Sequence, residues 1–181
     1  MLSFTHGLLV VILASPFAAA ARLRDGLYKI SYSPAPCSIE TKHYLDLSAP
    51  TTNATFNPIP EVQAQIWLVT TSATDSTWRR IQSEKYPGIS IGYPTPQREV
   101  RVRGIDENSE DFSTFNLVDT GKEGYYYMYP ITSRDFVVNG DTRIEARNRF
   151  AYFRGNATQF PLPMLPLLFS PVVPLPVLSN P

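Results

Sequence analysis

The chain is poor in the two side chains on which most catalytic and metal sites rely. Its 181 residues include a single cysteine, Cys37, and two histidines, His6 and His43. One cysteine cannot form an internal disulfide, so the fold must be stabilised by packing alone. Zinc sites need more His and Cys ligands than these, and we expect no metal and no cofactor. Cys37 itself is either a buried small side chain or one half of a bridge to another chain.

Two clusters of reactive residue types remain, and neither predicts an active site. Cys37 and His43 are near enough in sequence to form a nucleophile and a base, but no third residue nearby would orient them, and a short hairpin offers no oxyanion pocket. Four carboxylates crowd another segment: Asp106, Glu107, Glu110 and Asp111. Their spacing matches no calcium-binding loop, so we interpret this segment as a solvated loop. We therefore do not expect an enzyme.

The chain also lacks an excess of one charge, uninterrupted long apolar runs and helical periodicity. Its 16 basic and 16 acidic residues cancel to a net charge of zero, which argues against a nucleic-acid partner. Prolines interrupt the apolar segment from Phe160 to Leu178, which excludes a membrane helix there. No segment repeats apolar residues at intervals of three and four, and 17 prolines would break helix interiors. The fold class that remains is all-β.

The first 21 residues are typical of a secretory signal peptide. An apolar run from Gly7 to Ala14 precedes the small residues Ala18 to Ala21, a pattern that fits cleavage near Ala21. The apolar run is too short to span a bilayer, so we expect no membrane anchor. We predict one domain over residues 22–173, followed by a proline-rich tail over residues 174–181.

Secretion gives meaning to two triplets that match the N-glycosylation pattern. Asn53-Ala54-Thr55 and Asn156-Ala157-Thr158 each place an asparagine two residues before a threonine. A glycan can be attached only in an exposed loop, so Asn53 and Asn156 are predicted to lie in loops. We expect the mature protein outside the cell, as a monomer.

Short runs rich in β-branched and aromatic residues follow one another along the chain, separated by turn clusters such as Pro94-Thr95-Pro96 and Asn139-Gly140-Asp141. Many of these runs alternate apolar with polar residues, as a sheet with one buried face requires. The predicted strands are Leu27 to Tyr32, Tyr44 to Leu47, Ile66 to Thr70, Glu99 to Arg103, Phe115 to Val118, Tyr125 to Tyr129, Arg143 to Ala146 and Phe150 to Phe153, with Leu167 to Val173 as the closing strand.

Aromatic residues recur at a regular interval and divide the chain into three similar parts. Segments typical of the opening of a strand occur at Gly26 to Ile30, Ser76 to Ile81 and Gly124 to Met128. In these segments Tyr28 and Trp78 are 50 positions apart, and Trp78 and Tyr126 are 48 apart. A second series has intervals of 48 and 54: Trp67, Phe115 and Phe169. Three equivalent β units that close on one core predict a β-trefoil barrel with repeats of about 50 residues.

Two loops contain prolines that would hold the backbone extended. Ser33 to Lys42 contains two prolines, and Ser83 to Gly88 has Lys85 near its tip and Pro87 at its exit. A loop that is already extended loses little entropy when it enters a protease cleft, and trypsin-like proteases select Lys or Arg in their primary pocket. The candidate inhibitory residues are Ser83, Glu84, Lys85, Tyr86 and Pro87. The alternative for both loops is ordinary turn chemistry.

Three segments carry a resemblance to a known family: Asp25-Gly26-Leu27-Tyr28-Lys29-Ile30, Gln65-Ile66-Trp67-Leu68-Val69 and Tyr125 to Pro130. From Asp25 to about Phe153 the chain resembles the fungal β-trefoil protease inhibitors, the mycocypin and cospin-like group. The resemblance implies an endopeptidase as partner, of the serine or cysteine class, bound through loops between strands. Members of that group usually lack a signal segment and close with a Trp-containing strand, where this chain has Leu167 to Val173.

The alternative function comes from a different class of protein. Gln65-Ile66-Trp67 also resembles the Gln-Xaa-Trp signature of ricin-type trefoil lectins, which implies a glycan as partner. That signature normally repeats in each unit, whereas the equivalent places here are Ser113-Thr114-Phe115 and Leu167-Leu168-Phe169. Packing of one glutamine and one tryptophan in the scaffold would explain the single copy equally well.

Overall fold

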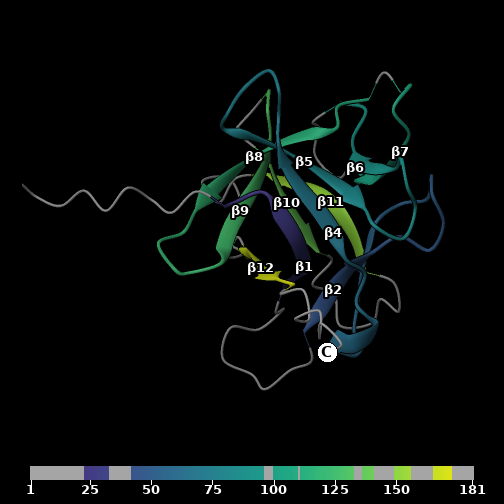
Figure 1. Cartoon of the computed structure of the whole chain (residues 1–181), viewed down its shortest axis with the longest axis vertical. Helices are drawn as coiled ribbons and strands as arrows, with labels where there is room; N and C mark the ends of the chain where they lie inside the picture. Colours follow the sequence, from purple (N-terminus) through teal and green to yellow (C-terminus); the bar gives the residue numbers. More distant parts are fainter. Residues whose placement is uncertain are drawn as a thin grey trace, which may run out of the picture.

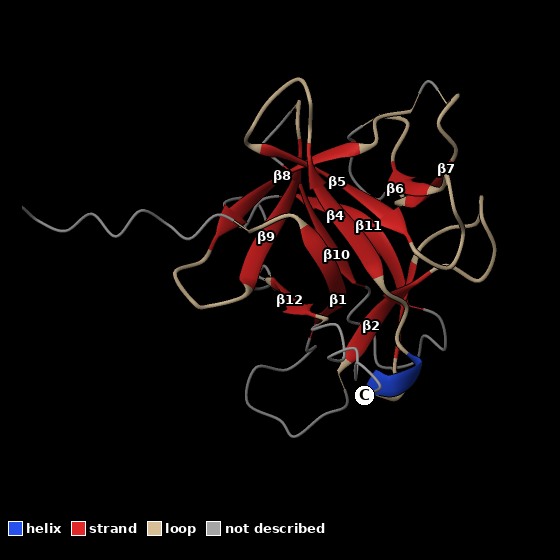
Figure 2. Cartoon of the chain, in the orientation of Figure 1, coloured by secondary structure: helices blue, strands red, loops and turns tan. Residues whose placement is uncertain are grey.

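The structure is a computed structural model that describes residues 23–32, 42–95, 100–109, 111–132, 136–140, 149–155 and 165–172. The strands in these segments are β1 (Gly26–Tyr32), β2 (His43–Asp46), β3 (Thr55–Asn57), β4 (Trp67–Thr71), β5 (Trp78–Ser83), β6 (Ser90–Gly92), β7 (Arg103–Ile105), β8 (Thr114–Asp119), β9 (Tyr125–Pro130), β10 (Phe136–Gly140), β11 (Arg149–Gly155) and β12 (Leu167–Pro171). A 3-10 helix, η1 (Glu61–Gln63), precedes β4, and the described part of the chain contains no helix long and apolar enough to cross a membrane (Figure 2).

Six of the strands close on themselves to form a barrel. β1 pairs with β4, β4 with β5, β5 with β8, β8 with β9, β9 with β12, and β12 with β1, always antiparallel. The remaining strands form the pairs β2–β3, β6–β7 and β10–β11. Figure 1 shows β6 beside β7. Each consecutive set of four strands therefore contributes two barrel strands and one hairpin. This is the β-trefoil predicted from the sequence.

Apolar side chains at equivalent positions of the three units fill the barrel. Ile30, Ile81 and Met128, on the first strand of each unit, are at most 1% exposed. Trp67 and Phe115, on the fourth strands of the first two units, are fully buried. Burial of side chains of this size stabilises a fold by about 2 kcal/mol each, relative to leaving them exposed.

The predicted repeat has the correct period, but its register is wrong by one residue in the second unit. Tyr28, Arg79 and Tyr126 face the same position of their fourth-strand partners, so Arg79 is the equivalent residue, not Trp78. Neighbouring residues of a strand point to opposite faces, which leaves Trp78 half-buried while Arg79 is buried. Arg79 donates from Nε and Nη2 to the carbonyl oxygen of Leu23, at 3.4 and 3.2 Å.

The fourth-strand series is offset by two residues in the third unit. Leu167 pairs with the first strand of its own unit, as Trp67 and Phe115 do in theirs. Leu167 and not Phe169 is therefore their equivalent. Phe169 is only 1% exposed because it points to the same face of β12 as Leu167. The spacing between aromatics pointed to Phe169 because counting residues assumes loops of equal length in the three units.

Most predicted strands are confirmed to within two residues, and the errors fall on short or irregular segments. The sequence did not predict strands at Thr55–Asn57, Ser90–Gly92 and Phe136–Gly140. The strand predicted at Glu99 to Arg103 is wrong, because among its described residues only Arg103 belongs to β7. Val102 accepts a bond from Ala54 at 2.9 Å and donates to Ala151 at 2.8 Å, so its peptide groups join two other segments. The segment predicted at Arg143 to Ala146 lies outside the described residues.

Candidate binding loop and adjoining pocket

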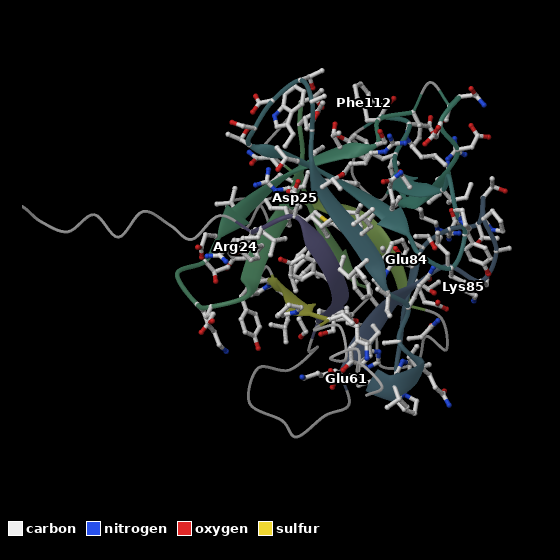
Figure 3. The ribbon with its side chains drawn as sticks, in the orientation of Figure 1. Arg24, Asp25, Glu61, Glu84, Lys85 and Phe112 are labelled. Carbon is white, nitrogen blue, oxygen red and sulfur yellow. The ribbon has the colours of Figure 1, made fainter. Side chains whose placement is uncertain are left out.

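The segment predicted to be inhibitory forms the loop between β5 and β6. Ser83 is the last residue of β5 and is buried, at 4% exposure. Its N–H donates to the carbonyl oxygen of Ile89 at 2.8 Å, which closes the base of the loop. Glu84 and Lys85 are exposed (Figure 3). Pro87 is exposed as well. The structure thus places the predicted residues in one exposed loop, except that Ser83 belongs to its buried base.

A tight turn fixes the exit of this loop. The Ile89 N–H donates to the carbonyl oxygen of Tyr86 at 3.1 Å, which encloses Pro87 and Gly88 as the central residues. Gly88 has a φ of +79°, in the left-handed region. Proline followed by a residue with positive φ is the arrangement of a type II turn. The sequence Pro87-Gly88 therefore determines the backbone path immediately after Tyr86.

Hydrogen bonds hold the residues on both sides of Lys85. The Glu84 N–H donates to the carbonyl oxygen of Ile66 at 3.1 Å. The Tyr86 N–H donates to the Ser83 hydroxyl at 3.0 Å, and the Tyr86 hydroxyl donates to the carbonyl oxygen of Ser48 at 2.8 Å. The ring of Tyr86 packs against the core. These bonds to separate strands and turns fix the loop to the rigid part of the fold.

Lys85 is exposed although its neighbours are held. Its Nζ lies 5.0 Å from the centroid of the Tyr86 ring, a cation–π contact worth about 0.5–1 kcal/mol at an exposed site. The peptide N–H and C=O of Lys85 make no hydrogen bond to any residue that the structure describes. Those two groups are therefore available to pair with an extended strand of a binding partner.

The side chain of Gln65 links the base of the loop to Leu47, the residue after β2. Its Nε2 donates to the Ser83 hydroxyl at 2.5 Å, and its Oε1 accepts a bond from the Leu47 N–H at 2.8 Å. The side chain is 6% exposed, so both bonds lie in the protein interior. Trp67 is fully buried, and its indole N–H donates to the Leu45 carbonyl oxygen at 3.2 Å. Both residues of the Gln-Xaa-Trp segment therefore make hydrogen bonds in the interior of the fold.

A pocket of about 400 Å³ opens beside the loop. Its walls come from the end of β2, from the end of η1 with the segment that joins it to β4, and from the loop itself: Asp46, Gln63, Ala64, Gln65, Ile66, Glu84 and Lys85. The Asn57 side chain donates to Oδ2 of Asp46 at 3.3 Å. Nothing in the sequence indicated this pocket, because its walls come from three separate segments.

One further carboxylate belongs to η1, the helix whose last residue lines the pocket. Glu61, on η1 and labelled in Figure 3, interacts with Tyr44 of β2. Burial raises the pKa of Tyr44, and the Glu61 carboxylate raises it further because it disfavours a second negative charge. The carbonyl oxygen of Glu61 also accepts a bond from Lys29 Nζ at 2.8 Å.

The remaining residues that the sequence singled out have varied positions. Asn53 is half-buried and forms an isolated bridge with Arg103 rather than lying in an open loop. Asn156 and Cys37 lie outside the described residues, as does most of the loop from Ser33 to Lys42. His43 is 6% exposed and its ring centroid lies 5.6 Å from that of Tyr32.

Arginines bind two of the crowded carboxylates. Asp111 accepts bonds from Nε and Nη2 of Arg103 at 2.9 and 2.6 Å, and Glu107 lies 3.9 Å from Arg80. Asp106 accepts a bond from the N–H of Asn108 at 2.9 Å. Across the described segments, no three His, Cys, Asp or Glu side chains are grouped so as to hold a metal ion.

Comparisons with known proteins bear on the fold alone. No family model matches the chain, and no curated protein sequence matches it. Among solved structures the chain is similar to a designed 3-fold symmetric protein, ThreeFoil, with 14% sequence identity and a TM-score of 0.56. The match covers 82% of this chain and 100% of ThreeFoil. The likeness to a three-fold symmetric protein agrees with the closed barrel of six strands, and the chain has the β-trefoil fold.

Proposed function

We propose that this chain is a secreted endopeptidase inhibitor, not an enzyme, that acts through the β5–β6 loop with Lys85 as the residue that enters the protease. The β-trefoil fold is shared by protease inhibitors and lectins, so the fold permits this function without selecting it. The resemblance of three sequence segments to the fungal β-trefoil inhibitors favours inhibition over sugar binding. The choice of loop depends on the geometry around Lys85.

The observation that carries the proposal is an exposed lysine between two immobilised neighbours. Glu84 and Tyr86 are held by hydrogen bonds to Ile66, Ser83 and Ser48, while the peptide groups of Lys85 bond to no described residue. A preformed loop avoids most of the entropy cost of ordering on binding. The central peptide can then pair with the protease as an extended substrate does.

The chemistry of Lys85 favours a trypsin-like serine protease. The primary pocket of such a protease contains a carboxylate that selects lysine or arginine. To enter it, Lys85 needs only to leave the Tyr86 ring, because the side chain is already exposed. The backbone on either side would keep its bonds to the scaffold.

Sugar binding is the second candidate, and the pocket beside the loop is the observation that favours it. Carboxylate and amide groups such as those of Asp46, Glu84 and Gln63 can bond to sugar hydroxyls. No aromatic ring lines the described walls of this pocket, so a sugar would have no flat apolar surface on which to stack.

Titration against three proteases tests the proposal. Purified protein is mixed in increasing ratio with trypsin, papain and an asparagine-specific protease, and residual activity is measured. We expect stoichiometric inhibition of trypsin. If all three enzymes keep full activity while the protein binds on a glycan array, the inhibitor proposal is wrong and the lectin is favoured.

Export and glycosylation belong to the same proposal. N-terminal sequencing of protein from culture medium should begin near Ala21 or Arg22, because the preceding residues form the signal peptide. Glycosidase treatment should lower the mass if Asn53 or Asn156 carries a glycan. A chain that starts at Met1 and stays inside cells would contradict secretion.

A further inference from the structure

The pocket beside Lys85 has an uneven balance of charge. Among the described residues that line it, Asp46 and Glu84 are carboxylates and Lys85 is the single cation. If Lys85 extends into the primary pocket of a protease, its positive charge leaves this wall. The two carboxylates then face the pocket without the lysine of its described lining.

Both carboxylates have capacity to accept further hydrogen bonds. Asp46 accepts a bond at Oδ2 from Asn57, at 3.3 Å, and an ionised carboxylate has about four acceptor positions. Glu84 is exposed. A guanidinium or ammonium group could therefore bond to either carboxylate without displacing a partner on which the fold depends.

The other walls suit the stem of a long basic side chain. Ala64 and Ile66 supply apolar surface, and lysine and arginine cover such surface with their methylene groups while the charged head stays polar. Gln65 fixes one wall because it is bonded to Leu47 and Ser83. The volume of about 400 Å³ is large enough for one such side chain.

From this arrangement we infer that the pocket binds a basic side chain, arginine or lysine, on the surface of the protease that Lys85 enters. The inference rests on the proposed function for the identity of the partner, and on the pocket itself for the chemistry. Lys85 and the pocket then form one continuous surface. The lysine of the inhibitor enters the protease, and a basic side chain of the protease enters the pocket of the inhibitor. Opposite charges across an interface favour specificity and the rate of association.

A titration with a small cation tests the pocket without any protease. ¹H–¹⁵N NMR spectra of the full chain are recorded with increasing Nα-acetyl-arginine amide, and in parallel with the neutral analogue Nα-acetyl-citrulline amide. We expect arginine-dependent shifts of the amides of Gln63, Gln65 and Glu84, and none with citrulline. The doubly substituted variant Asp46→Asn, Glu84→Gln should lose the response.

The lysine variants make the test specific. Lys85→Ala should bind the arginine probe roughly threefold more tightly, because it removes a like charge from the wall of the pocket, and a like charge at about 6 Å in water would weaken binding by that factor. Lys122→Ala, which removes a lysine on a different loop, should leave probe affinity unchanged. Glu84→Gln alone is a second variant that keeps the fold intact, since this side chain is exposed.

The outcomes separate the pocket from the proposed function. Absence of arginine-dependent shifts, equal shifts with citrulline, or shifts caused only by a monosaccharide would overturn the inference, even if trypsin is inhibited. An arginine response that depends on Asp46 and Glu84, in a protein that inhibits no protease, would support the cation pocket and contradict the proposed function.

Discussion

Lys85 and Lys122 lie on two loops that share local features but differ in how their backbones are held. Each lysine is exposed, and each Nζ lies over a tyrosine ring, 5.0 Å from that of Tyr86 and 4.1 Å from that of Tyr125. Charge and exposure alone would make them equal candidates for a protease. The hydrogen bonds of their peptide groups distinguish them.

In the loop of Lys122, between β8 and β9, both peptide groups of the lysine itself are bonded. The Lys122 N–H donates to the Thr120 hydroxyl at 3.2 Å, and its carbonyl oxygen accepts a bond from the Tyr125 N–H at 3.0 Å. In the β5–β6 loop the bonds go instead from the neighbours of Lys85 to Ser48 and Ile66. A substrate-like loop needs fixed flanks and a free central peptide, and only the second loop combines them.

The largest expected effect is on inhibition by the two lysine variants. Lys85→Ala should weaken inhibition of trypsin by roughly 100-fold or more, because the primary pocket of the protease loses its cation. Lys122→Ala should leave inhibition unchanged. Inhibition constants from steady-state kinetics measure both, and equal losses in the two variants would mean that the loops do not differ as described.

Gln65→Ala is expected to destabilise the fold by about 2–3 kcal/mol, because it leaves the buried Leu47 N–H without its acceptor and Ser83 without a donor. Gln63→Ala is the matched control, since Gln63 is exposed, and it should change stability by less than about 0.5 kcal/mol. Urea denaturation of each variant gives the free energy of unfolding. Equal stabilities would show that Gln65 does not support the loop.

Gly88→Ala and Gly121→Ala form a pair with the same backbone strain. Their φ values are +79° and +81°, and an added Cβ would meet nothing within 4 Å at either position. Each substitution should therefore cost about 1–2 kcal/mol of stability, from the left-handed backbone alone. Only Gly88→Ala should also weaken trypsin inhibition, which thermal unfolding and inhibition kinetics would separate.

The smallest effect concerns the tyrosine hydroxyls. Tyr86→Phe removes the bond to Ser48 and should weaken inhibition by roughly five- to tenfold, or about 1 kcal/mol. Tyr125→Phe keeps the ring beneath Lys122 and should have no effect on inhibition. A loss that is the same in both variants would show that the bond from Tyr86 to Ser48 does not preorganise the loop.

The sequence predicted the barrel strands better than the hairpins, for a physical reason. Barrel strands such as Trp78–Ser83 are long enough to show alternation between the core and the outer face. Strands of three residues, such as Thr55–Asn57, are too short to show any period. Strand register also depends on pairing, which is why Trp78 was taken for the equivalent of Tyr28 in place of Arg79.

The exposure of the candidate loop could be predicted, but its support could not. Pro87 and Gly88 indicate a turn in the sequence itself. The bond from Tyr86 to Ser48 joins residues 38 positions apart, and no local pattern indicates such a partner. The pocket could not be predicted for the same reason, because Asp46 and Glu84 are distant in sequence and the fold brings both to its walls.

Competition with benzamidine tests whether Lys85 occupies the primary pocket of trypsin. Benzamidine occupies the primary pocket of trypsin with a cationic amidinium group, at the carboxylate that should bind Lys85. Equilibrium binding of the purified protein to trypsin is measured with increasing benzamidine. We expect strictly competitive displacement, with an apparent dissociation constant that rises in proportion to the benzamidine concentration. Binding that is unchanged by saturating benzamidine would contradict the placement of Lys85 in the protease.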